Sequence, residues 1–222
     1  VGKGETVGLV GESGCGKSTI AFGIVNFLGP NGKIVDGSIR FQDNELVGRS
    51  QEELKQLRGN RIAMVFQDPM QALNPSVRLG EQLAEVLTCH NEDISQDEAW
   101  QRCIEMLKRV NMPDVENVMT RYSHQISGGQ QQRVVIAMAM LNNPALLIMD
   151  EPTAVLAPQE IERLFAVMRL IKEEGRSVIF ITHKLEEVLE ISDYITVLRR
   201  GKIMSTVRPE KIRRKDQNVS RE

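Results

Sequence analysis

The chain has 222 residues, which is enough for one sizeable α/β core with an insertion but too short for two independent large domains. Its 28 basic and 30 acidic residues give a formal net charge of -2, so no overall basic field favours nucleic acid as a partner. The longest apolar run, Val134–Leu141, is far shorter than the roughly 18 residues that can span a bilayer. Three cysteines, Cys15, Cys89 and Cys103, form no CxxC pair, which favours a reducing compartment and suggests neither a disulfide framework nor a zinc site.

Apolar runs of strand length alternate with helical patterns along the chain. This alternation predicts an α/β fold with a mostly parallel sheet covered by helices. Several of the runs are apolar on both faces, as buried parallel strands are. The predicted strands are Thr6–Val10, Arg61–Phe66, Ala145–Met149, Ser177–Thr182 and Tyr194–Leu198.

Residues 68–144 differ from the rest because they form long, charged, helix-favouring segments without a clear strand. We therefore expect a helical subdomain at 68–144, inserted between core segments 1–67 and 145–222. Beyond it, apolar residues spaced three and four apart predict a helix between Pro158 and Gly175. The chain then reads as a strand, a glycine turn and a strand over 197–207, followed by a solvated tail over 212–222 to which no function is assigned.

The stretch directly after the first predicted strand matches the pattern G-x-x-x-x-G-K-[ST]. Glycines let successive backbone amides turn inward around anionic oxygens, and the following helix adds its positive end. The lysine can reach the terminal phosphates of a nucleotide, and the Ser18 hydroxyl can ligate Mg²⁺. The predicted nucleotide-binding residues are Gly11, Glu12, Ser13, Gly14, Cys15, Gly16, Lys17, Ser18 and Thr19.

Polar residues follow three other predicted strands, at the strand ends where parallel sheets bind ligands. Asp150 is expected to hold Mg²⁺ through its water shell, and Glu151 to orient and activate the attacking water. Gln67 is predicted to contact Mg²⁺ and that water, and His183 to sense the γ-phosphate. Alone, Gln67 or His183 would more often be an ordinary loop residue, and the two carboxylates would be so about half of the time. The phosphate loop, and for Gln67 and His183 also the carboxylates, favour the catalytic interpretation.

Five motifs, in this order, resemble the nucleotide-binding subunit of ATP-binding-cassette (ABC) transporters. They are "GESGCGKST" at 11–19, Gln67, "ISGGQ" at 126–130, "LLIMDEP" at 146–152 and His183. The resemblance covers essentially the whole chain and implies a P-loop NTPase fold of the RecA-like kind, with ATP and Mg²⁺ as ligands. It also implies a cytoplasmic location, peripheral on the membrane.

In the ABC family, two such domains pair head to tail, and "ISGGQ" of one domain closes over the ATP held by the other. Ser127 is a suitable N-cap and Gly128 and Gly129 leave amides open, so the helix that follows can present its positive end to an anion. Alone, such a turn is more often merely flexible. The resemblance assigns ATP contacts across the dimer to Ser127, Gly128, Gly129 and Gln130.

The family resemblance implies two further partners, a second ABC ATPase domain and integral membrane permease subunits. The permease contact is expected at Met70, Leu73 and Val77, although these residues could equally pack the loop that carries them. Up to about Thr153 the chain resembles peptide importers, and from there on sugar or nucleoside importers. Ala157 stands where the family usually has aspartate.

The family also places strands with an adenine-stacking aromatic residue before the first residue of this chain. Without them, ATP affinity is expected to fall by up to roughly tenfold. The predicted function is the ATPase subunit of an importer, and peptides are the favoured class of transported solute. Two alternatives remain open, a non-transport ABC ATPase and a truncated or mosaic domain that binds nucleotide without turnover.

Overall fold

The computed structural model describes residues 1–29, 31–91 and 93–212, and a six-stranded sheet forms its centre. The strand order is β4-β5-β6-β1-β7-β8, and every neighbouring pair is parallel except β7 with β8. The predicted α/β fold with a mostly parallel sheet is thus confirmed. The strands are β1 (Thr6–Val10), β4 (Ile62–Val65), β5 (Leu146–Asp150), β6 (Ser177–Thr182), β7 (Tyr194–Arg199) and β8 (Lys202–Val207).

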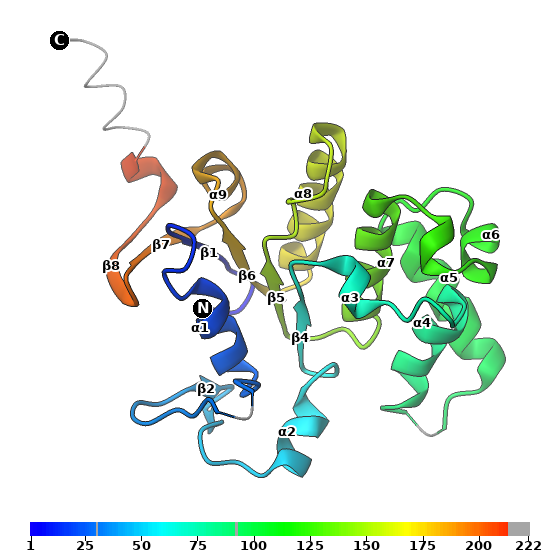
Figure 1. Cartoon of the computed structure of the whole chain (residues 1–222), viewed down its shortest axis with the longest axis horizontal. Helices are drawn as coiled ribbons and strands as arrows, with labels where there is room; N and C mark the ends of the chain where they lie inside the picture. Colours follow the sequence, from blue (N-terminus) through cyan, green and yellow to red (C-terminus); the bar gives the residue numbers. More distant parts are fainter. Residues whose placement is uncertain (30, 92, 213–222) are drawn as a thin grey trace.

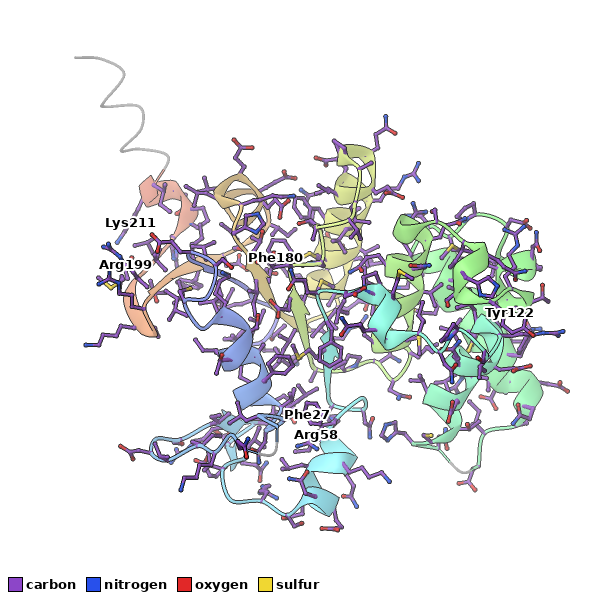
Figure 2. The ribbon with its side chains drawn as sticks, in the orientation of Figure 1. Phe27, Arg58, Tyr122, Phe180, Arg199 and Lys211 are labelled. Carbon is purple, nitrogen blue, oxygen red and sulfur yellow. The ribbon has the colours of Figure 1, made fainter. Side chains whose placement is uncertain are left out.

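Both faces of the sheet are buried, because side chains alternate between two apolar clusters along each central strand. In β5, Leu147 and Met149 face one cluster and Ile148 the other. The first cluster includes side chains of α8 (Pro158–Glu173) and α9 (Leu185–Ile191), and the second includes those of α1 (Lys17–Ile24). Phe180 lies in the middle of the molecule in Figure 2 and packs edge to face against Phe165 of α8.

A group of helices lies beside the β4 edge of the sheet (Figure 1). Within 68–91 and 93–144 the structure contains helices and no strand. The apolar cores of these helices and of the sheet are continuous, and α7 packs against β4. The helices are α3 (Pro69–Ala72), α4 (Leu79–Thr88), α5 (Gln96–Arg109), α6 (Val115–Thr120), η1 (Ser123–Gln125) and α7 (Gly128–Met140).

The segment between α1 and β4 forms a small hairpin and a helix that the sequence patterns did not predict. Strands β2 (Arg40–Phe41) and β3 (Asn44–Glu45) pair antiparallel, and helix α2 (Gln51–Leu57) follows. Ser50 begins α2 with a capping box, in which its hydroxyl accepts from the Glu53 amide. Strands of two residues are too short to show an alternating pattern, which explains the omission.

Helix α8 confirms the predicted apolar stripe, because Leu164, Phe165, Met168 and Ile171 are all buried. None of the helices in the described part of the chain is both long and apolar enough to cross a membrane. The strand–turn–strand expected over 197–207 is present as β7 and β8. Most of the expected tail, residues 213–222, falls outside the described residues.

Candidate functional site

The loop that joins β1 to α1 has a backbone that only glycine allows at its key positions. Gly16 caps α1 with φ of 103°, a left-handed conformation that disfavours residues with a side chain. A Cβ at Gly11 would lie 2.2 Å from the Leu198 carbonyl oxygen on β7. The close approach of the loop to β7 therefore requires glycine at position 11.

Lys17 folds back over this loop. Its Nζ donates to the carbonyl oxygens of Gly11 and Glu12, at 2.9 and 3.0 Å, and the residue is only 6% exposed. Within the described residues, its ammonium group forms no ion pair with a carboxylate. A partly buried cation held only by neutral carbonyls, next to the N-terminus of α1, is well placed to attract an anion.

Three strand ends meet this loop at a cavity of about 410 Å³. Parallel strands β4, β5 and β6 end at the same edge of the sheet, so the residues that follow them converge there. The predicted residues that line the cavity are Ser13, Gly14, Gly16, Lys17, Ser18, Thr19, Gln67, Glu151 and His183. Of the loop residues, Gly11, Glu12 and Cys15 are not part of the lining, and Cys15 is buried.

Glu151 and His183 lie next to each other in this cavity. The Nδ1 atom of His183 is 3.1 Å from Oε2 of Glu151. The Glu151 backbone has a positive φ of 47°, which is unusual for a residue with a side chain, and its amide donates to the Ile181 carbonyl at 2.8 Å. Such a backbone conformation, held by a bond to the neighbouring strand, aims the carboxylate into the cavity.

Asp150 lies behind Glu151, at the end of β5, and is 4% exposed. Burial raises the pKa of Asp150; the Glu151 charge adds to this, while a hydrogen bond from Ser18 and the Lys17 charge oppose it. Its Oδ1 atom is buried and has no hydrogen-bond partner among the described residues. An unpaired carboxylate oxygen beside a serine hydroxyl fits a hard cation such as Mg²⁺, which prefers oxygen ligands.

The "ISGGQ" turn does not line this cavity. Ser127 caps α7 in a capping box with Gln130, which uses the amides of both residues and leaves those of Gly128 and Gly129 outside the box. Gly128 is exposed and Gly129 is buried. An anion at this turn would therefore be a different one from the anion that the cavity can hold.

The buried side of the turn packs against the N-terminus of α8. A Cβ at Gly129 would lie 2.2 Å from Oε1 of Glu160. The same carboxylate pairs with Arg133 of α7 at 2.7 Å and accepts from the Ala157 amide at 3.2 Å. The turn is thus connected to the loop that follows Asp150 and Glu151.

An apolar groove of about 330 Å³ lies between the β4 edge and the helices beside it. Phe27 and Arg58, which Figure 2 labels close together, belong to its lining and are 6.0 Å apart from ring to guanidinium. Phe66, Ala72, Val135 and Met138 also line it. Leu73 was expected either in a permease contact or in the packing of its loop, and it is buried at 3% exposure in the core, which favours the packing interpretation for this residue.

The sequence patterns missed two buried polar residues behind the cavity, Thr153 and Glu187. Both are less than 10% exposed, and the Thr153 hydroxyl donates to the Glu187 carboxylate at 2.8 Å. The only signal in the sequence is that Glu187 lies four residues after His183, inside an otherwise apolar helix face. The contact joins residues 34 positions apart, so no local pattern could reveal it.

The phosphate-type loop, the carboxylates at the end of β5 and the capped "ISGGQ" turn are together the features of an ATP-binding cassette. A family model described as ABC transporter matches residues 1–154, and the chain belongs to this family. Among curated relatives, it is similar to the oligopeptide transport ATP-binding protein OppD of Escherichia coli K12. The two are 44% identical over 202 residues, which is 90% of this chain and 59% of the relative.

A second relative is the oligopeptide transport ATP-binding protein AppD of Bacillus subtilis 168, 41% identical over 206 residues. That alignment covers 92% of this chain and 62% of AppD, so the chain spans about three fifths of the length of these relatives. The expected sugar or nucleoside resemblance of the C-terminal part is not shown, because similarity to these peptide-transport proteins extends over nine tenths of the chain.

Solved structures give the same family. The ATP-binding cassette MJ0796, described as a dimer in a post-hydrolysis state bound to ADP and Pi, has a TM-score of 0.82 and 29% identity, and the match covers 93% of this chain and 86% of MJ0796. CbiO1 from Clostridium perfringens, described as part of the ABC transporter complex cbiONQ, has a TM-score of 0.80 and 26% identity, over 99% of this chain and 83% of CbiO1. The P-loop NTPase fold predicted from the motifs is confirmed.

Proposed function

We propose that this chain binds MgATP and hydrolyses it to power a peptide importer, at the cytoplasmic face of the membrane. The observation that carries this proposal is the cavity where the Lys17 loop, Glu151, His183 and Gln67 meet. The peptide class rests on the printed names of the relatives, which are oligopeptide transport ATP-binding proteins. A non-transport ATPase and a domain without turnover are not favoured.

Nucleotide binding would depend on the loop between β1 and α1. Residues of this loop and of the first turn of α1 line the cavity, and Lys17 can exchange its two carbonyl contacts for phosphate oxygens. Such an exchange is favourable because a bond between an ammonium group and an anion is stronger than one to a neutral carbonyl. Lys17 therefore supplies affinity for the terminal phosphates.

Hydrolysis would begin with Glu151 as the general base. Glu151 accepts a proton from a water molecule as the water oxygen bonds to the γ-phosphorus, and the bond from that phosphorus to the bridging oxygen breaks, releasing ADP and phosphate. His183, beside Glu151, contacts a γ-phosphate oxygen and thereby senses whether the third phosphate is present. Gln67 orients the water from the β4 side of the cavity.

The residues that would hold Mg²⁺ are Ser18, Asp150 and Gln67. The unpaired, buried Oδ1 atom of Asp150 supports this assignment, with Asp150 acting through the water shell of the ion. When bound, Mg²⁺ neutralises charge on the β- and γ-phosphate oxygens. In the part of the chain that the structure describes, no group of three or more His, Cys, Asp or Glu side chains could hold a metal by itself, and on this account water and nucleotide oxygens would complete the site.

Complete enclosure of ATP would require a second cassette. Ser127, Gly128, Gly129 and Gln130 lie outside the cavity lining and offer amides at the N-terminus of the 13-residue helix α7. We infer that these residues contact the nucleotide held by a partner cassette, identical or paralogous, in a head-to-tail pair. The dimeric, ADP-bound MJ0796 structure supports this arrangement.

The permease subunits would contact the apolar groove beside β4. Phe66 lines this groove and is 39% exposed. Met70, which lies between the lining residues Phe66 and Ala72 in the sequence, is 64% exposed, so apolar surface is available to a short helix from a membrane subunit. ATP-driven closure of the cassette pair would then move the attached permease subunits between two states. Val77, partly buried, remains a candidate for the same contact.

Phosphate release by the wild type and by Glu151→Gln, measured side by side, tests the proposed activity. The account predicts clear MgATP-dependent release by the wild type and almost none by the variant. Light scattering of Glu151→Gln should show a doubled mass on addition of MgATP. Equal and negligible rates for both proteins would instead support a domain that binds nucleotide without turnover.

A further inference from the structure

Glu187 is a buried carboxylate that the proposed reaction does not use. It lies in the first turn of α9 and is 7% exposed. Its Oε2 atom accepts hydrogen bonds from two threonine hydroxyls, from Thr153 at 2.8 Å and from Thr182 at 3.0 Å. Burying a charge is costly unless hydrogen bonds and an ion pair compensate for it, so this arrangement needs a physical reason.

The two threonines belong to the two loops that carry the proposed catalytic pair. Thr153 follows Glu151 by two residues at the end of β5, and Thr182 directly precedes His183 at the end of β6. Both hydroxyls donate to the same carboxylate oxygen, so Glu187 connects the two loops from behind the cavity. The two strand ends also meet through the hydrogen bond from the Glu151 amide to the Ile181 carbonyl and through the 3.1 Å contact between Glu151 and His183.

Lys184 strengthens the same connection. Its Nζ lies 3.0 Å from Oε1 of Glu187, and its backbone amide donates to the Thr182 hydroxyl at 3.1 Å. The residues on either side of His183 are thus both bound to the Glu187 network. These bonds hold the backbone at His183, and therefore the point from which its imidazole reaches Glu151.

We propose that Glu187 is a positioning residue that holds His183 against Glu151 by linking Thr153 and Thr182. This inference rests on the proposed function for its effect on turnover. The geometry that it explains can nevertheless be measured without nucleotide. Glu187 itself is not one of the residues that line the cavity, and on this account it does not touch the substrate.

The direct test is the NMR spectrum of nucleotide-free protein with ¹⁵N-labelled histidines. Glu187→Gln should shift the ring signals of His183 and leave those of His90 and His124 unchanged. The matched control is Glu186→Gln, the same substitution at the exposed neighbouring residue, which should move none of the three. Unchanged His183 signals in Glu187→Gln would overturn the proposal. This outcome is independent of whether the protein hydrolyses ATP.

A second test separates positioning from simple damage to the fold. Glu187→Gln should lower kcat about tenfold, on the scale of one lost charge-assisted hydrogen bond, while the Kd for MgATP changes less than about twofold. In a His183→Ala background, Glu187→Gln should cost almost nothing further, because the residue acts through His183. Two fully independent losses that multiply in the double variant would contradict the proposal.

Thr153→Val provides a variant of nearly the same shape in case Glu187→Gln does not fold. It removes one of the two donors and leaves the carboxylate in place. A smaller shift of the His183 signal in the same direction supports the inference, and no shift contradicts it. The thermal midpoint of each variant, measured without nucleotide, shows that the comparison is between folded proteins.

Discussion

His183 Nδ1 lies 3.1 Å from Glu151 Oε2, although the two residues end different strands and are 32 positions apart in the chain. The contact forms because β5 and β6 are parallel neighbours whose carboxyl ends meet at one edge of the sheet. The bond from the Glu151 amide to the Ile181 carbonyl further couples the two strand ends. The general base and the γ-phosphate sensor of the proposed reaction are therefore one structural unit.

Glu151→Gln should reduce turnover by about 10²–10⁴, the usual contribution of a positioned general base. MgATP binding should be retained, because the phosphate loop is unchanged. Phosphate release and binding of a fluorescent ATP analogue measure the two effects separately. Glu162→Gln, the same substitution at an exposed position of α8, is the control and should behave as the wild type. A parallel loss of binding and turnover in Glu151→Gln would argue against the assigned role.

Lys17→Met should weaken MgATP binding at least about tenfold, because the variant loses the cation that contacts the terminal phosphates. Isothermal titration calorimetry gives the affinity directly. Lys202→Met changes the same charge at an exposed position of β8 and should leave the affinity unchanged. Equal affinities of both variants would mean that Lys17 does not contact the nucleotide.

Asp150→Asn should make the metal-free protein more stable. Burial raises the pKa of Asp150, so the folded protein disfavours its charged form. The residue therefore destabilises the fold increasingly as the pH rises from the ordinary carboxyl pKa to that raised pKa, and by a constant amount above it. The neutral variant avoids this cost, and its Tm with EDTA at neutral pH should rise by at least about 2 °C. The variant should also lose the stabilisation that MgATP gives the wild type. A Tm below that of the wild type, measured without nucleotide, would contradict the predicted gain in stability.

Gly128 and Gly129 form a matched pair for the turn before α7. Alanine at position 129 would place its Cβ 2.2 Å from the Glu160 carboxylate, whereas alanine at position 128 would meet nothing within 4 Å. The Glu160 carboxylate would have to move and give up its contacts with Arg133 and the Ala157 amide, so Gly129→Ala should destabilise the protein by about 1–3 kcal/mol. Gly128→Ala should change the stability by less than about 0.5 kcal/mol, since surface substitutions seldom do more. Urea unfolding of both variants checks the difference, and equal destabilisation would contradict this packing.

Much of the fold could be predicted from the sequence, because buried strands such as Ser177–Thr182 are continuous apolar runs and α8 has a clear apolar stripe. The hairpin at 40–45 could not, since its strands are two residues long. The position of Leu73 was left open between a permease contact and loop packing, because an apolar residue in a loop gives no sign of whether it faces solvent or the core.

The candidate site shows the same division between local and distant signals. The loop at 11–19 is recognisable because its glycines and lysine lie close together in the chain, and the structure places most of the loop residues around one cavity. The link from Glu160 to Gly129 and the Glu187 network join distant segments, so their residues look ordinary in sequence. Only the fold reveals which polar side chains support the site from behind.

The central claim is that one complete ATP site takes its phosphate loop from one cassette and its "ISGGQ" turn from another. A mixing experiment tests it most directly, with Lys17→Met and Ser127→Arg variants that are each inactive alone. In a mixed pair, one site combines the two intact halves, so the mixture should recover about a quarter of the wild-type phosphate release if the variants pair at random in equal amounts. A mixture that stays inactive while the wild type turns over, or a Ser127→Arg variant that hydrolyses ATP at the wild-type rate by itself, would contradict the account.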